Sequence, residues 1–124
     1  KKKESTGEAL LQILETRLDN VAFRLNFART RQQARQLVNH GHVYVNQNKV
    51  TIPSYNVKIG DVISLSPKAA NLDFIKVLAE ETKGEKTPTW LSKKALVGKV
   101  EKEPIREELE GQIDERLIVE FYSR

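Results

Sequence analysis

Seven cationic side chains between residues 17 and 58 are the groups in this sequence whose type and spacing could do chemistry. The segment holds one carboxylate, Asp19, against five arginines and two lysines: Arg17, Arg24, Arg29, Arg31, Arg35, Lys49 and Lys58. An arginine guanidinium grips phosphate oxygens in pairs and stacks on exposed bases. Residues 67–124, in contrast, contain eleven cations against twelve carboxylates. A positive field confined to one segment indicates a polyanionic partner at one face.

The composition excludes several other chemistries. The 124 residues include no cysteine, which removes disulfides, thiolate nucleophiles and cysteine-based zinc sites. No phosphate-cradling glycine loop, nucleophile elbow or zinc-protease pattern occurs. No apolar run approaches the roughly 20 residues that span a bilayer. We therefore expect a soluble, intracellular protein that is not an enzyme, needs no cofactor or metal, and has no membrane partner.

Helical periodicity places most of these cations on two short helices. Apolar side chains predict a helix over 7–15 and a second over 17–27, where Leu18, Val21, Ala22 and Leu25 share one face. Thr30 and Gln33 form a capping box that opens a third helix, which ends at Gly41. Ala34, Leu37 and Val38 form its buried stripe. Arg31 and Arg35, one turn apart, flank that stripe and project to one side.

After Gly41 the apolar period changes to two, which predicts strands. We expect a hairpin with strands 43–45 and 49–52 and a turn at 46–48, then a strand over 62–65, a helix near 69–81, a polar loop over 82–89 and a final strand over 117–122, with 97–100 as its candidate partner. The predicted fold is α+β, in three parts: an N-terminal helix in 1–16, a module of two basic helices and a hairpin in 17–66, and flanking helix and strands in 67–124.

Such a module suits structured RNA. An A-form helix hides its base edges in a deep groove, so proteins read its phosphate spacing and 2′-hydroxyls instead. Rings and neutral donors near the hairpin add to the cations: His40, His42, Tyr44 and Tyr55, with Asn46, Asn48 and Ser54.

A family resemblance rests on the run RLDNVAFRLNFARTRQQARQLVNHGHVYVNQNKVTIPSYNVKIGDVISL. It is similar to the RNA-binding module named after ribosomal small-subunit protein four. Related modules occur in pseudouridine synthases, some aminoacyl-tRNA synthetases and a heat-shock RNA-binding protein, so the module alone implies only RNA binding. The flanking LETRLDN, TIPSY, Trp90-Leu91 and LIVEFYSR resemble the ribosomal family itself, in its bacterial or organellar form.

The resemblance implies a structural component of the small ribosomal subunit, in the cytoplasm of a bacterium or in an organelle. It implies binding to the five-prime domain of small-subunit ribosomal RNA early in assembly, beside neighbouring ribosomal proteins and the channel through which messenger RNA enters. The RNA contacts that we expect on this pattern are Arg17, Arg24, Arg29, Arg31, Arg35, Gln36, His40, Asn46, Lys49, Ser54, Tyr55 and Lys58.

Two departures from the family stand out. Its members usually carry a large N-terminal domain before this region, sometimes with a zinc site, and this sequence does not include it. The hairpin turn usually reads Asn-Gly, whereas here it reads Asn46-Gln47-Asn48. We expect an asparagine to take the left-handed conformation instead.

Several features have a plainer interpretation beside the functional one. Asp19 follows Arg-Leu, as the catalytic aspartate of pseudouridine synthases does, but pairing with a nearby arginine or backbone amide is favoured. His40 and His42 lack a third metal ligand, so packing at the helix end is favoured. The acidic stretch 101–115, with Glu107, Glu108 and Glu110, is interpreted as a solvated face, with a protein-partner surface as the alternative. Packing is favoured over base stacking for Trp90, Phe121 and Tyr122.

Three functions remain open from the sequence. The first is a structural ribosomal protein, which would co-sediment with the small subunit at one copy. The second is a stand-alone RNA-binding factor with the same module, acting in ribosome rescue or maturation. The third is an RNA-binding domain appended to an enzyme, which a longer reading frame would reveal.

Overall fold

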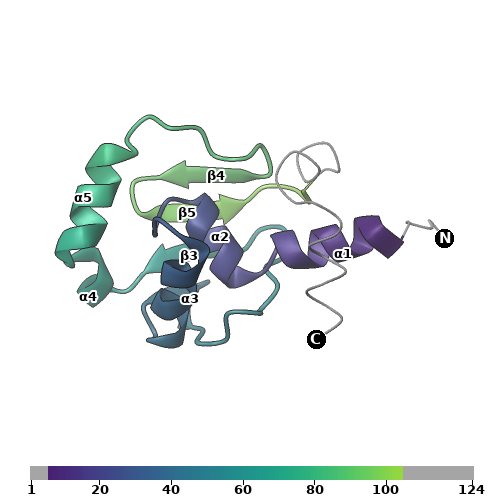
Figure 1. Cartoon of the computed structure of the whole chain (residues 1–124), viewed down its shortest axis with the longest axis horizontal. Coiled ribbons are helices and arrows are strands. Elements are labelled where there is room, and N and C mark those ends of the chain that lie inside the picture. Colours follow the sequence, from purple (N-terminus) through teal and green to yellow (C-terminus); the bar gives the residue numbers. More distant parts are fainter. Residues whose placement is uncertain (1–5, 105–124) are drawn as a thin grey trace.

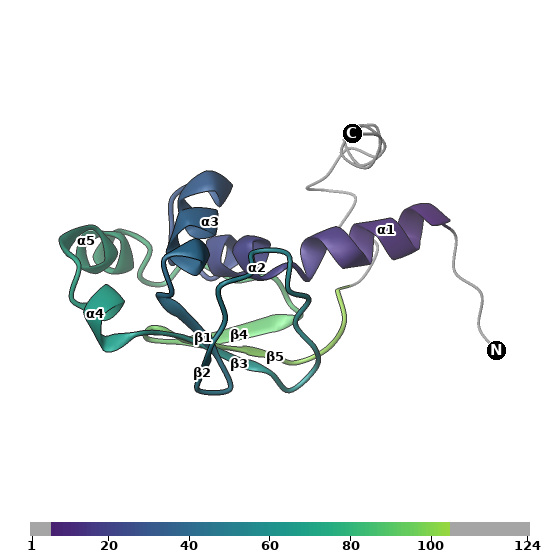
Figure 2. The ribbon, with the colours of Figure 1, turned by 90° about the horizontal axis from the view of Figure 1, so that it is seen from below.

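A five-stranded antiparallel sheet, covered on one face by helices, forms the body of the protein (Figures 1 and 2). The structure is a computed structural model and describes residues 6–104. Its helices are α1 (Thr6–Glu15), α2 (Leu18–Arg24), α3 (Arg31–Asn39), α4 (Pro67–Ala70) and α5 (Asp73–Glu81), and its strands are β1 (Val43–Val45), β2 (Asn48–Lys49), β3 (Val62–Leu65), β4 (Leu91–Lys94) and β5 (Val97–Val100). The strand order is β2-β1-β3-β5-β4. The predicted α+β class is confirmed.

Helices α2 and α3 pack their apolar faces onto the sheet, with α1 at one end and α4 and α5 at the other (Figure 2). The apolar positions predicted for α2 and α3 are all buried: Leu18, Val21, Ala22, Leu25, Ala34, Leu37 and Val38. Helix α2 ends at Arg24, earlier than predicted, and Asn26 then takes a left-handed conformation with φ 62°. The Thr30 cap is confirmed, since its hydroxyl accepts the backbone N–H of Gln33 at 3.0 Å. The packing leaves the other side of α3 in solvent.

The hairpin turn uses two left-handed residues. Asn46 has φ 53° and Gln47 has φ 70°, the pattern of a type I′ turn, so the prediction of a left-handed asparagine is confirmed. The Asn46 side chain also holds the turn to the next strand. Its Nδ2 donates to Asp61 Oδ1 at 3.0 Å, and its Oδ1 accepts the backbone N–H of Val62 at 3.0 Å. Strand β2 ends at Lys49, three residues before the predicted end.

Three expectations for the second half are corrected. The helix predicted near 69–81 is two helices, because Leu72 is extended (ψ 138°) and Ser66 caps a separate first turn. Strand β4 lies beyond the predicted polar loop and was not foreseen. The pairing of 97–100 with 117–122 is wrong, since β3 and β4 occupy the two edges of β5. The predicted strand 117–122, with Phe121 and Tyr122, and most of the acidic stretch lie outside the described residues. The division at 16 and 66 stays a prediction.

Close packing of α2 on the sheet depends on Gly98. A Cβ atom at Gly98 would lie 2.4 Å from Leu25 Cδ1 and 2.6 Å from Leu25 Cδ2. We expect Gly98→Ala to lower the free energy of unfolding by about 1–3 kcal/mol in urea denaturation, since overpacking forces side chains and backbone apart. Leu25→Ala alone should cost about 2–5 kcal/mol. The double variant should cost less than the sum, because the new methyl group enters the vacated space. Additive losses would contradict this contact.

Candidate nucleic-acid interface

The side chain of Arg31 is held in place at the start of α3. Its Nε donates to Asn20 Oδ1 at 2.9 Å, and its guanidinium carbon lies 4.7 Å from the centroid of the Phe23 ring. Asn20 is itself fixed, because its Nδ2 donates to the Glu15 carbonyl at 2.7 Å. Burial of the guanidinium, together with the nearby charge of Arg24, lowers the pKa of Arg31 from its ordinary value. An arginine stays protonated in proteins, so Arg31 presents a cation in a preset orientation.

Further polar groups lie on the same helix and at its end. Arg35 is exposed, one turn after Arg31, and has no side-chain partner among the described residues; Gln36 and His40 are exposed as well. Lys49 belongs to the hairpin, and its side chain passes close to Gly41 at the end of α3. A Cβ atom added to Gly41 would lie 3.2 Å from Lys49 Cδ. The five side chains that we call the α3 surface are Arg31, Arg35, Gln36, His40 and Lys49.

Arg17 is tied to the start of α2. Its Nε donates to Asp19 Oδ1 at 3.1 Å and its Nη2 to Asp19 Oδ2 at 3.0 Å. Asp19 Oδ1 also accepts the backbone N–H of Asn20 at 2.7 Å. The structural role favoured for Asp19 is therefore confirmed: its carboxylate pairs with Arg17 and also accepts a backbone N–H.

Arg24 forms an ion pair in the interior. Its Nε donates to Glu15 Oε2 at 3.1 Å, with side-chain exposures of 15% for Arg24 and 1% for Glu15. Its guanidinium carbon also lies 5.5 Å from the Phe23 ring centroid. Arg24 thus compensates a buried carboxylate and adds its charge beside Arg31.

The remaining predicted contacts are spread around the molecule. Arg29 pairs with Glu81 of α5, with both side chains about half exposed. The Tyr55 ring packs partly on the core while its carbonyl accepts the N–H of Leu18 at 2.7 Å, and Ser54 is exposed in the same loop. Asn46 supports the hairpin turn. The twelve predicted residues come from several elements, and the α3 surface contains the five of them that lie on α3, at its end or across its end.

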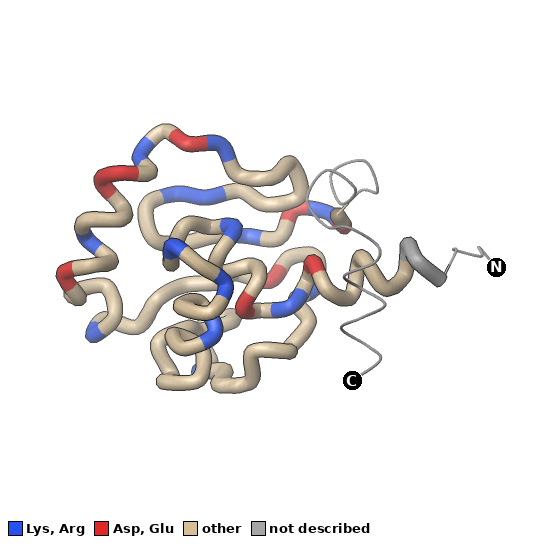
Figure 3. The backbone as a smooth tube through the Cα atoms, in the orientation of Figure 1, with Lys and Arg blue, Asp and Glu red and all other residues tan. Residues whose placement is uncertain are grey.

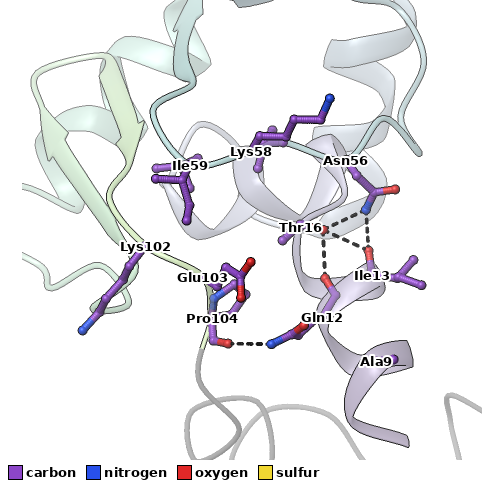
Figure 4. A pocket seen from close by; sticks show the side chains of 12 residues that line it. Ala9, Gln12, Ile13, Thr16, Asn56, Lys58, Ile59, Lys102, Glu103 and Pro104 are labelled. Atoms are coloured by element: carbon purple, nitrogen blue, oxygen red, sulfur yellow. Dashed lines mark hydrogen bonds between the residues drawn. The ribbon is translucent and has the colours of Figure 1, made fainter. Parts of the chain in front are cut away.

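Lys58 lines a hollow of about 670 Å³ beside α1, which Figure 4 shows from close by. Asn56 closes one side, since its Nδ2 donates to the Ile13 carbonyl and to Thr16 Oγ1, both at 2.8 Å. Gln12 reaches the Pro104 carbonyl across it. Within residues 6–104, no three His, Asp or Glu side chains gather as metal ligands.

The two histidines belong to the end of α3 and the start of the sheet. Their ring centroids lie 6.4 Å apart, edge to face, and His42 Nδ1 lies 3.4 Å from Ser66 Oγ. Burial, and then the charge of Lys68, lower the pKa of His42 from its ordinary value. The packing role favoured for this pair is consistent with these contacts.

Across the described part of the chain, no helix has the length and apolar character needed to traverse a bilayer.

Sequence reasoning missed the side chains that orient Arg31. Asn20 and Arg31 lie eleven residues apart, and Phe23 belongs to α2 rather than α3. Helical spacing links residues three or four apart, so no local pattern connects them. In Figure 3, basic residues follow α3 and β4, and acidic residues occur toward α5 and near the end of α1.

Comparison with known proteins found a matching domain and similar ribosomal proteins. Residues 16–63 match the family described as S4 domain. The chain is 48% identical over 126 residues to small ribosomal subunit protein uS4 of Thermus thermophilus, covering 100% of the chain and 60% of the relative. Identity is 56% over 124 residues to the uS4 protein of Herpetosiphon aurantiacus (96% of the chain, 58% of the relative) and 52% over 128 residues to that of Aquifex aeolicus (100% and 61%). This chain is therefore similar, over 96–100% of its length, to uS4 proteins of the small ribosomal subunit, and it spans about three-fifths of the length of these relatives.

Proposed function

We propose that this chain is a non-catalytic component of the small ribosomal subunit that binds ribosomal RNA through the α3 surface. The observation that carries the proposal is the placement of Arg31 and Arg35 one turn apart on the exposed side of α3, with Arg31 oriented by Asn20 and Phe23. The S4 domain is an RNA-binding domain, and the relatives are named as small-subunit proteins.

The geometry supports recognition of RNA by shape. Side chains at positions i and i+4 of a helix stand about 5–6 Å apart at Cβ, so both guanidinium groups can grip the same stretch of phosphate backbone. Lys49 extends the contact past the end of α3. Because these cations are proposed to contact phosphates, affinity should follow RNA shape more than sequence.

We further propose the five-prime domain of the small-subunit RNA as the target, bound early in assembly next to other ribosomal proteins and the channel through which messenger RNA enters. The 48–56% identity extends to 96–100% of the chain, well beyond residues 16–63. This extent favours a ribosomal protein over a stand-alone factor or an enzyme's appended domain, which would share the module alone. The proposed location is the ribosome, in the cytoplasm of a bacterium.

A salt titration tests the proposal. Binding of the 124-residue chain to a transcript of the five-prime domain should weaken steeply with salt, because each neutralised phosphate releases counterions. Each phosphate contact contributes about −0.7 to −0.9 to the slope of the logarithm of the association constant against the logarithm of the salt concentration. The three cations of the α3 surface alone therefore give a slope of about −2 or steeper. Filter binding between 0.05 and 0.5 M KCl (about tenfold in salt) measures it. A slope near zero would overturn the proposal.

A further inference from the structure

The face of the sheet that points away from α2 and α3 carries a row of polar and basic side chains. Cross-strand partners in an antiparallel sheet lie on the same face. The register joins Lys49, Tyr44, Ser64, Val97 and Lys94 in one continuous row across all five strands. A parallel row joins Val62, Lys99 and Ser92. We call these eight residues the open sheet face.

The alternate rows point to the helices. Ile63 and Gly98 are buried under α2, and Lys93, their partner in register, lies over the Phe27 ring at 5.8 Å. Lys93 is thereby kept from the open sheet face, whereas Lys94 and Lys99 are exposed on it. No described helix covers this face (Figure 2).

The charge on the open sheet face is positive. Lys49, Lys94 and Lys99 are exposed, and none has a side-chain ion pair among the described residues. The carboxylate that continues β5, Glu101, accepts a hydrogen bond from Ser92 Oγ at 2.7 Å. Tyr44 and Val97 add half-exposed apolar surface between the lysines, and Val97 is 44% exposed. Three cations and a tyrosine ring on one face suit an anionic chain that also offers flat rings for stacking.

Lys49 makes this face continuous with the α3 surface. In register it is the partner of Tyr44, and its aliphatic chain crosses Gly41 at the end of α3. A strand bound to α3 can therefore pass Lys49 at the hairpin and reach the open sheet face.

We propose that the open sheet face is a second RNA-binding surface, in which Lys94 and Lys99 contact phosphates and the Tyr44 ring supports a base, so that RNA wraps the β1–β2 edge from the α3 surface. This inference rests on the proposed function. It enlarges the interface from one helix to two faces of the domain.

The test compares Lys94→Gln/Lys99→Gln with Lys76→Gln/Lys83→Gln. The control pair removes the same charge from exposed positions on α5 and the turn after it, on the helix side of the sheet. The probe is the five-prime domain transcript, titrated with salt. Loss of two phosphate contacts should make the slope of the salt titration shallower by about 1.4–1.8. If the curves of the variant and the wild type converge near 1 M salt, binding by the variant is then about 25- to 60-fold weaker at roughly 0.1 M salt. The control should keep the wild-type slope. Thermal melting followed by circular dichroism checks that both variants are folded.

A second measurement locates the contact directly. Amine acetylation read by mass spectrometry should show that the transcript protects Lys94 and Lys99 in the wild-type chain, and leaves Lys76 reactive. An unchanged slope in the Lys94/Lys99 variant, together with a reduced slope in an Arg31/Arg35 variant, would overturn the second surface and leave the proposed function standing. Unchanged slopes in both variants would overturn the proposed function as well. Protection that appears only in assembled subunits, and not with the transcript, would overturn the inference in favour of a protein partner.

Discussion

Replacing Arg31 and Arg35 together by alanine is expected to remove most of the affinity for small-subunit ribosomal RNA and to leave the fold intact. Hydrogen bonds to charged groups contribute about 1.5–3 kcal/mol each, so the loss of one such contact per arginine weakens binding by about two to four orders of magnitude. Arg35 has no intramolecular partner among residues 6–104. Arg31→Ala removes the donor to Oδ1 of Asn20, which is 4% exposed, so we expect the free energy of unfolding to fall by about 1–3 kcal/mol while the chain stays folded. Filter binding to the five-prime domain transcript and a urea melt measure the two effects.

Matched variants separate charge from geometry. Lys76→Ala/Lys83→Ala removes two exposed cations from elsewhere on the surface and should leave binding within a few-fold of wild type. Arg31→Lys/Arg35→Lys keeps both charges but loses the planar fork, so its affinity should lie between the wild type and the alanine pair. Wild-type binding by the alanine pair would move the interface away from α3.

Removing Arg24 should damage the fold rather than the RNA contact. Arg24→Ala leaves the Glu15 carboxylate, which is 1% exposed, without its ion-pair partner. Breaking a buried pair by removing one member costs about 3–5 kcal/mol, because an uncompensated charge stays in the interior. Urea denaturation of the variant should show this loss of unfolding free energy.

The companion variant changes both members of the pair. Arg24→Met with Glu15→Leu keeps similar volumes and removes both charges, so its stability should lie close to that of the wild type. In the folded double variant, RNA affinity should fall far less than in the Arg31/Arg35 variant. Full stability of Arg24→Ala with lost RNA binding would show instead that Arg24 is a direct contact, as the sequence alone suggests.

The interior of the two central helices was predictable because it depends on local spacing. Leu18, Val21 and Leu25 recur at helical intervals, and all three are buried. The Thr30 cap and the end of α3 before Gly41 are equally local, since each depends on the backbone needs of a few neighbouring residues. For the same reason Arg31 and Arg35 were placed together correctly, as side chains one helical turn apart.

Strand β4 escaped prediction for the opposite reason. Its sequence, Leu91–Lys94, has one buried apolar residue and two lysines, which is weak strand periodicity. Pairing with β5 is what makes it a strand. The break between α4 and α5 likewise depends on backbone angles at Leu72 that the apolar stripe does not encode.

The segregation of charge toward residues 17–58 was determined by the sequence by itself, and with it the inference of a polyanionic partner. Only the tertiary structure decided which of those cations remain available. Arg24 meets Glu15 nine residues away and Arg29 meets Glu81 fifty-two residues away, so the charges of these two arginines are matched by carboxylates, whereas Arg35 has no such partner among residues 6–104. The register likewise turned Lys94 and Lys99 toward a face shared with Lys49. The physical reason is that charge composition adds along a chain, whereas pairing and exposure depend on distances that folding sets.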